Sequence, residues 1–180
     1  YVIIKKKPFH LCPDFLNLKF ITFCILKVGL KKYPPRTRNL KKILSLIKKE
    51  KNMRYTISGC IIAIRDKNIL IIREFSNITE TVILKADSTL LWDKKYLVEN
   101  KSKTTKYIVK ALGINGWNLI KNNVKKDLLN LPFSVRIALP SFNTLDGLIS
   151  VPHLNVWSGL KEKKELSVSS EDWQNFDYDI

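Results

Sequence analysis

The chain has 180 residues, of which 45% are hydrophobic and 27% are charged. A chain of this length buries about two-thirds of its unfolded surface on folding, which excludes a disordered tail and a miniature scaffold. Its 6 Gly and 7 Pro exclude collagen-like and low-complexity classes. Because 32 Lys and Arg outnumber 16 Asp and Glu, the formal charge is +16, which favours a polyanionic partner.

The first residue is Tyr1 and the only methionine is Met53, so we interpret the chain as a piece of a longer protein. Basic residues at 5–7 and an apolar stretch at 20–26 are typical of a secretory signal, but no small-residue cleavage site follows them. The same stretch is much shorter than the roughly 20 apolar residues of a membrane span. We therefore expect a cytoplasmic protein without a membrane partner.

Cysteine usage fits the same compartment. Cys12, Cys24 and Cys60 are odd in number and widely spaced, with no CxxC pair and no histidine cluster nearby. This pattern disfavours a disulfide framework and a zinc site. We expect free thiols in a reducing cytosol and no metal site.

Charge divides the chain more clearly than any linker does. Residues 1–54 contain 15 Lys and Arg against two acids, whereas the net charge after residue 160 is negative. We expect a basic helical segment over 1–54, a β-rich domain over 55–157 and a loose acidic tail over 158–180. The predicted fold class is α+β, an N-terminal basic helical segment followed by a small antiparallel β-rich domain with one or two helices.

Two helices are predicted in the first third. Residues 14–28 are apolar on all sides, which indicates either a buried helix ending at Gly29 or a strand. The consecutive prolines within residues 33–36 predict a turn. Asn39 is the expected N-cap of the second helix, whose lysines occupy the arc opposite to Leu40, Ile43, Leu44, Leu46 and Ile47.

From residue 55 the pattern changes to short β-rich runs. Residues 58–64 and 69–72 flank the turn residues 66–68 and predict a hairpin. One further helix is predicted over residues 117–129, with Trp117, Ile120, Val124 and Leu128 on one side. Further strands are expected at 81–86, 90–92, 96–98, 106–109 and 148–151.

Motifs for catalysis are missing from the sequence. The only histidines, His10 and His153, have no triad setting, and we leave open whether His153 contacts RNA or is structural. The patterns GxxxxGK[ST] and GxGxxG are absent, as is the Ser-Gly-Gly-x-Asp-Ser loop of ATP pyrophosphatases. Asp146 before Gly147 is typical of a turn. We therefore predict no catalytic residue and no cofactor in this chain.

The basic residues are more informative. Residues 31–49 contain eight cations and no acid, an arrangement suited to contacting successive phosphates. A solvated surface, or the lysine-rich usage of an AT-rich genome, is the competing interpretation. Arg54 and Arg136 join the candidates because a guanidinium can fork to phosphate, although it can also pair internally. The candidates for nucleic-acid contact are thus Lys31, Lys32, Arg36, Arg38, Lys41, Lys42, Lys48, Lys49, Arg54 and Arg136.

Several short segments follow one another in a characteristic order and spacing. They are Tyr33-Pro34-Pro35-Arg36, Thr56-Ile57-Ser58-Gly59-Cys60, Ile72-Arg73-Glu74, Trp92-Asp93-Lys94-Lys95-Tyr96, Ala111-Leu112-Gly113, Leu131-Pro132, Ala138-Leu139-Pro140 and Asp146-Gly147 through Val151-Pro152-His153-Leu154. Together these segments resemble the C-terminal part of bacterial tRNA(Ile)-lysidine synthases, especially the alphaproteobacterial type, over roughly residues 20–157. Ser58 replaces a glycine of the family pattern and Lys95 replaces an arginine. Residues 1–14 match nothing in it and are expected to be linker or out-of-frame sequence.

Members of this family use ATP and Mg²⁺ to adenylate an anticodon cytidine of isoleucine tRNA and then attach lysine to it. Nothing in this chain resembles the N-terminal ATP-pyrophosphatase domain that performs this chemistry. The resemblance implies a tRNA-binding portion that is not catalytic by itself. Its expected partners are isoleucine tRNA and a pyrophosphatase domain, either upstream or on a separate chain. The resemblance also adds Lys94 and Lys95 to the candidate tRNA contacts.

Two other hypotheses stay open. In the first, the chain is an inactive remnant of a fragmented gene. In the second, it is a generic basic RNA-binding module. Cooperative thermal unfolding would count against a remnant, because decayed sequence loses its packing first. A preference for isoleucine tRNA over bulk tRNA would count against a generic module.

Overall fold

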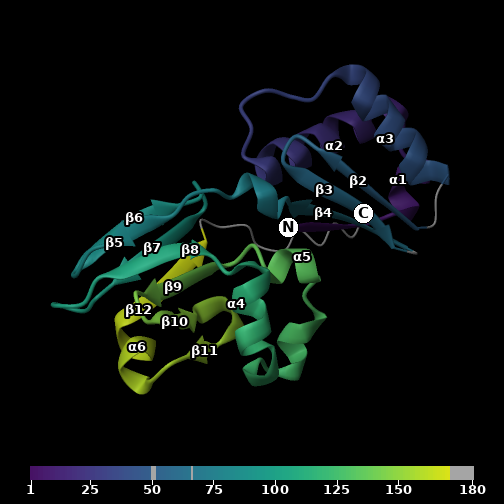
Figure 1. Cartoon of the computed structure of the whole chain (residues 1–180). Helices are drawn as coiled ribbons and strands as arrows, with labels where there is room; N and C mark the ends of the chain where they lie inside the picture. The colour runs from purple at the N-terminus through teal and green to yellow at the C-terminus, as the bar shows by residue number, and fades with distance from the viewer. Residues whose placement is uncertain (50–51, 66, 171–180) are drawn as a thin grey trace. The chain divides into compact units, whose positions relative to one another are not determined.

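The computed structural model describes residues 1–49, 52–65 and 67–170 (Figure 1). These residues form two compact units, one over residues 1–77 and one over residues 78–170. Both units combine helices with antiparallel strands, which confirms the α+β class. The charge boundary at residue 54 therefore lies inside the first unit, whose strands continue beyond it.

The first unit contains one four-stranded antiparallel sheet in the order β1-β4-β3-β2. Its strands are β1 (Val2–Lys5), β2 (Asn52–Ile57), β3 (Cys60–Arg65) and β4 (Asn68–Arg73). The predicted hairpin is confirmed, because β3 and β4 pair from Cys60 opposite Arg73 to Arg65 opposite Asn68. Of the predicted turn residues, Asp66 lies outside the described residues. The helical elements are α1 (Lys7–Leu11), α2 (Asp14–Gly29), α3 (Thr37–Lys49) and the short 3₁₀ turn η1 (Phe75–Asn77).

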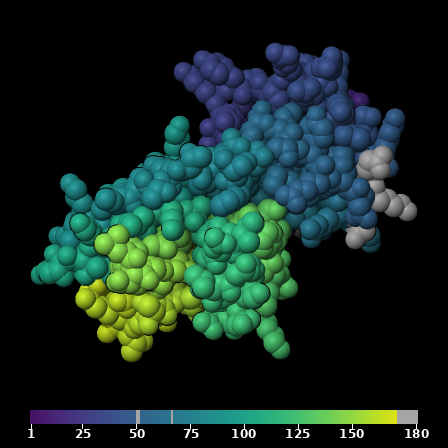
Figure 2. Space-filling view, viewed as in Figure 1, coloured from purple at the N-terminus to yellow at the C-terminus, as the bar shows by residue number. Residues whose placement is uncertain are grey.

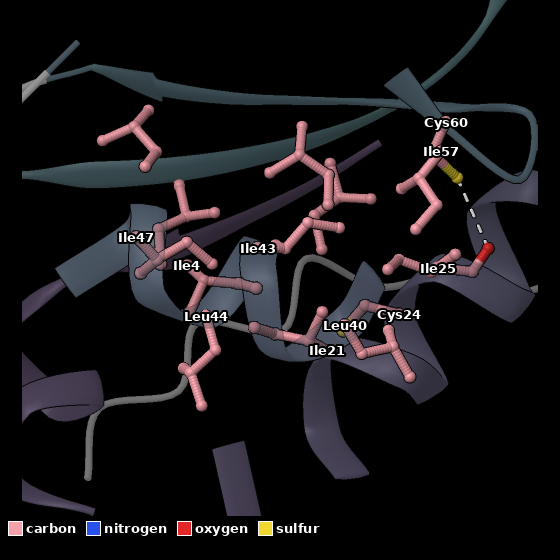
Figure 3. Packing of buried hydrophobic residues seen from close by; sticks show 14 of the residues in the cluster. Ile4, Ile21, Cys24, Ile25, Leu40, Ile43, Leu44, Ile47, Ile57 and Cys60 are labelled. Atoms are coloured by element: carbon pink, nitrogen blue, oxygen red, sulfur yellow. Dashed lines mark hydrogen bonds between the residues drawn. The ribbon is translucent and has the colours of Figure 1, made fainter. Parts of the chain in front are cut away.

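Helices α2 and α3 pack their apolar sides against the sheet (Figure 3). Ile21 and Ile25 of α2 and Ile43 and Ile47 of α3 are completely buried. The remaining side of α2 is exposed, including Phe15, Leu16 and Phe23. Residues 14–28 therefore form a helix with one buried side, neither a strand nor a helix enclosed on every side.

Helix α3 begins two residues before the predicted N-cap. The carbonyl of Arg36 accepts the first two helical hydrogen bonds, from the N–H groups of Asn39 (2.9 Å) and Leu40 (3.2 Å). Asn39 therefore lies inside the helix, and its prediction as the cap is wrong. Pro34 and Pro35 explain the earlier start, because a proline ring presets the backbone angle just before the first turn.

Residues 1–14 belong to the fold of the first unit. Strand β1 pairs with β4 from Val2 opposite Ile71 to Lys5 opposite Asn68, and Phe9 of α1 is buried in the core. The Asn17 side chain donates hydrogen bonds to the carbonyls of Phe9 (3.0 Å) and Cys12 (3.1 Å), which fixes α1 to α2. The expectation of a linker over residues 1–14 is therefore wrong.

The second unit contains two antiparallel sheets, in the orders β11-β10-β9-β8-β5 and β12-β7-β6. The strands are β5 (Val82–Leu84), β6 (Ser88–Trp92), β7 (Tyr96–Asn100), β8 (Tyr107–Ala111), β9 (Pro140–Thr144), β10 (Gly147–Val151), β11 (Val156–Trp157) and β12 (Leu166–Ser170). The helical elements are α4 (Gly113–Ile120), η2 (Lys121–Asn123), η3 (Lys126–Asn130), α5 (Phe133–Arg136), η4 (Pro152–Leu154) and α6 (Leu160–Glu165). All five predicted strands of this unit are found close to their expected positions.

The core of the second unit surrounds Trp92 and Phe142, both completely buried. The Trp92 indole N–H is satisfied inside the protein, because it donates to the carbonyl of Glu80 at 3.1 Å. This bond allows a large side chain with a polar atom to serve as the centre of a core.

Two predictions in this unit are wrong. The helix expected over residues 117–129 starts at Gly113 and ends at Ile120, and Val124 is extended (φ −83°, ψ 133°). Asn122 and Asn123 have low helix propensity, which explains the break. Residues 160–170 are not loose, since they form α6 and β12, while residues 171–180 of the expected tail lie outside the described residues.

Candidate nucleic-acid interface

The outer side of α3 carries three exposed cations. Arg38, Lys42 and Lys49 lie within an arc of about 40° at 100° per residue. The arc is opposite to the buried side of the helix, formed by Leu40, Ile43, Leu44 and Ile47. We call Arg38, Lys42 and Lys49 the α3 basic face, and Figure 2 shows this stretch of the chain, in dark blue, at the molecular surface.

The other two lysines of α3 lie at the border between its polar and apolar sides. Lys41 is exposed, whereas Lys48 is partly buried and forms an ion pair with Asp14 of α2. The charge of Lys48 is thus already balanced within the protein, and a phosphate would have to compete with the Asp14 carboxylate for it. The sequence alone groups Lys48 with the outward cations. Its partner Asp14 is 34 residues away, so the ion pair cannot be seen in the local pattern.

The segment before α3 brings further cations to the surface. Lys31, Lys32 and Arg36 are exposed, and the ammonium of Lys32 lies 5.7 Å from the centre of the Tyr33 ring. Lys31 packs its aliphatic stem near Gly59. This segment leads directly into α3, so its cations and the α3 basic face belong to one continuous stretch of the first unit.

Arg54 is not brought to the α3 basic face. Its neighbours Met53, Tyr55 and Ile57 pack against the first core, and side chains alternate between the two faces of a strand. Arg54 therefore points to the opposite side of β2, where it is exposed. Tyr55, in contrast, is on the core side of β2, and the Lys42 ammonium is 5.4 Å from the centre of its ring.

Lys94 and Lys95 belong to the second unit, at the tight turn between β6 and β7. Asp93 and Lys94 both have left-handed backbone angles (φ 46° and 52°), and Lys94 is exposed. The Lys95 ammonium lies 5.0 Å from the centre of the Tyr96 ring. Burial raises the pKa of Tyr96 to about 12, so this ring is a neutral aromatic surface at pH 7.

His153 packs edge-on against the same tyrosine, with 5.3 Å between the ring centres. Burial, and secondly the charge of Lys95, lower the pKa of His153 below its ordinary value. The imidazole is therefore neutral at pH 7 and adds no charge for a phosphate. These contacts favour the structural interpretation of His153.

Arg136 lies at the end of α5 in the second unit. Its guanidinium carbon is 4.1 Å from the centre of the Trp117 ring and 5.9 Å from that of Phe133. Sequence reasoning assigned Trp117 to a helix core and gave Phe133 no role. The spacing of Phe133 and Arg136, three residues apart after Pro132, could have indicated a shared helical side.

Other kinds of site have little support in the described part of the chain. No group of three His, Cys, Asp or Glu residues there could hold a metal ion. Likewise, none of the helices in the described ranges has the length and hydropathy needed to cross a bilayer. The three cysteines are free thiols. Burial raises the pKa of Cys24 to about 11 and that of Cys60 to about 12, which makes both thiols poor nucleophiles.

Comparison with known proteins gives a distant relationship. The tRNA(Ile)-lysidine synthase of Rickettsia typhi is 23% identical over 147 residues, covering 79% of this chain and 34% of that enzyme. The Rickettsia conorii enzyme is 26% identical over 160 residues, covering 86% of this chain and 33% of the enzyme. The Wolbachia pipientis enzyme is 36% identical over 98 residues, covering 53% of this chain and 23% of that enzyme.

The chain is distantly similar to tRNA(Ile)-lysidine synthases. It spans about a third of the length of the curated relatives that match most of it. No family model matches the chain. No solved structure matches it either.

Proposed function

We propose that this chain is the tRNA-binding portion of a tRNA(Ile)-lysidine synthase. In this proposal it holds isoleucine tRNA in the cytoplasm, while an ATP-pyrophosphatase domain attaches lysine to an anticodon cytidine. That domain lies in the same polypeptide or on a companion chain and binds the ATP and Mg²⁺. The α3 basic face, on a chain similar to lysidine synthases over most of its length, is the observation that supports the proposal most strongly.

The spacing of the three cations suits a nucleic-acid backbone. Arg38 and Lys49 are eleven residues apart, which is about 16 Å along a helix that rises 1.5 Å per residue. Several successive phosphates of one strand fit within such a distance. The core packing of α3 holds the helix in place, so the cations are presented without a large rearrangement. Contacts of this kind position an RNA without reading its sequence.

The wider field of the first unit acts in the same direction. Residues 1–77 contain 18 Lys and Arg but only four Asp and Glu. A surface with this imbalance attracts RNA from solution and increases the rate of encounter. Lys31, Lys32, Arg36 and Lys41 are also exposed and add to the positive charge of the first unit. In the proposal, Lys48, Arg54, Lys94, Lys95 and Arg136 contribute from other positions.

Neutralising the α3 basic face tests the proposal. Replacing Arg38, Lys42 and Lys49 together with Gln is expected to weaken binding of isoleucine tRNA about tenfold in 100 mM salt, because several phosphate contacts are lost. The matched control replaces Lys161, Lys163 and Lys164 with Gln, which removes the same charge from exposed positions in the second unit. The control should bind within about threefold of the unmodified chain. Equal losses in the two variants would contradict the proposal.

Competition between tRNAs tests the identity of the partner. A portion of a lysidine synthase is expected to prefer isoleucine tRNA to bulk tRNA in a competition titration. Equal competition by the two would instead identify a generic basic RNA-binding module.

A further inference from the structure

The guanidinium of Arg136 lies over the ring of Trp117. Trp117 is 7% exposed and belongs to α4, so its indole is almost completely enclosed by protein. At 4.1 Å from the ring centre, the Arg136 guanidinium is in cation–π contact with this indole. Phe133, one turn earlier on α5, lies beside the guanidinium and is 44% exposed.

The Arg136 side chain makes no hydrogen bond to another described residue. Its Nε is buried and has no hydrogen-bond partner among the described residues. No carboxylate in the described ranges forms an ion pair with it. Burial lowers its pKa, but a guanidinium remains charged at neutral pH.

Arg73 of the first unit shows how a partly buried arginine is usually satisfied, by hydrogen bonds within the protein. It donates to the carbonyls of Gly29 at 2.8 Å and Asn77 at 3.3 Å, so its guanidinium joins segments of the protein. The guanidinium of Arg136 instead rests on an aromatic ring and donates to no group among the described residues. A structural role explains the cation–π contact but leaves the guanidinium N–H donors without a function.

The available chemistry is that of a phosphate fork beside an aromatic surface. A stacked guanidinium presents its edge N–H groups in the plane that matches the oxygens of a phosphate. An exposed phenyl ring beside it can stack on a nucleobase, which requires a base that is not already stacked in a duplex. Residues 78–180 contain 14 Lys and Arg against 12 acids, so any capture of RNA there depends on local contacts.

We propose that Trp117, Arg136 and Phe133 form a binding site for one unpaired RNA nucleotide. Arg136, oriented by Trp117, holds the phosphate, and Phe133 stacks on the base. The inference rests on the proposed function in one respect, that the ligand of the chain is RNA. It adds a second contact region, in the second unit, that recognises single-stranded RNA.

Binding of two labelled RNAs to the full chain tests this site. One probe is an unpaired RNA of eight nucleotides, and the other is a blunt duplex of the same sequence. Arg136→Lys and Phe133→Leu are each expected to weaken binding of the single strand about fivefold or more, while duplex binding changes less than about twofold. Arg136→Lys retains the positive charge. Weaker single-strand binding by this variant would therefore show that the planar guanidinium, and not charge alone, is required.

Three results would overturn the site. They are a failure of the unmodified chain to bind the single strand, unchanged single-strand binding in both variants, and an equal loss for the duplex. Native tryptophan emission and the thermal midpoint serve as checks that both variants are folded.

The two proposals can fail separately. If isoleucine tRNA binding depends on the α3 basic face but single-strand affinity is unchanged by the Arg136 and Phe133 substitutions, only the nucleotide site is wrong. If single-strand affinity falls in the Arg136 and Phe133 variants but tRNA affinity is unchanged when the α3 basic face is neutralised, only the proposed role of α3 is wrong.

Discussion

Gly29 sits where α2 meets the turn between β2 and β3. A Cβ atom at this position would be 2.3 Å from the backbone oxygen of Ser58, much closer than carbon and oxygen can approach. The Arg73 guanidinium also donates to the Gly29 carbonyl at 2.8 Å. The close approach of α2 to the hairpin therefore depends on a residue without a side chain.

Gly29→Ala is expected to destabilise the chain by about 2 kcal/mol or more, because backbone atoms on both sides must move apart. Gly116→Ala is the control, since its crowded neighbour is the flexible end of the Leu112 side chain. Alanine in a helix also gains up to about 1 kcal/mol over glycine there. Urea unfolding followed by circular dichroism measures both variants, and equal destabilisation would contradict the close contact at Gly29.

The buried thiols of Cys24 and Cys60 make stability depend on pH. Burial raises their pKa values from 9.0 to about 11 and about 12, so the folded chain retains protons that the unfolded chain releases above pH 9. Their contribution to the free energy of unfolding is complete below pH 9 and decreases as the pH rises towards 12.

Replacing both thiols with Ala should make the free energy of unfolding less sensitive to pH between 9 and 11. Urea titrations at several pH values measure this change in slope. In the unmodified chain at pH 9, Cys24 and Cys60 should react with a thiol reagent only after unfolding. Rapid reaction of all three cysteines in the native chain would contradict their burial.

Local patterns predicted those elements that local contacts determine. The arc of apolar residues in α3 and the two runs of isoleucine in the β3–β4 hairpin are visible within a few residues. The pairing of β12 with β7 is not, because Leu166 faces Asn100 from 66 residues further along the chain. Alternation in Leu166-Ser-Val-Ser-Ser predicts a strand only weakly, and the surrounding acids suggested a solvated tail.

Strand β12 is expected to contribute to stability through Leu166, which is 2% exposed. Leu166→Ala should cost about 2–5 kcal/mol, the usual loss when a buried leucine is truncated. Leu160→Ala, at a position that is 79% exposed, is the matched control and should change stability by less than about 0.5 kcal/mol. Thermal unfolding of both variants decides whether residues 160–170 belong to the second unit, and no difference between them would contradict the packing of β12.

At the scale of the whole molecule, each unit has its own core. Among the residues that the structure describes, fifteen buried ones form the first core around α2, α3 and the sheet, and a separate group around Trp92 and Phe142 forms the second. A remnant of a fragmented gene would lose such packing early, because selection no longer maintains it. Cooperative thermal unfolding of the chain would therefore count against a remnant.

The candidate interface was only partly predictable. The sequence reveals the density of cations in residues 31–49, since charge needs no fold to be counted. It does not reveal that Lys48 pairs with Asp14, that Arg54 points away from α3, or that Arg136 lies over Trp117. Each of these depends on tertiary contacts between residues far apart in sequence.

The salt dependence of tRNA binding shows whether the α3 basic face contacts phosphates. The affinity of the full chain for isoleucine tRNA is measured from 50 to 300 mM salt, with the Arg38, Lys42 and Lys49 to Gln variant in parallel. If these cations contact phosphates, the slope of log affinity against log salt becomes shallower by about 2–3 in the variant. An unchanged slope would remove the α3 basic face from the interface.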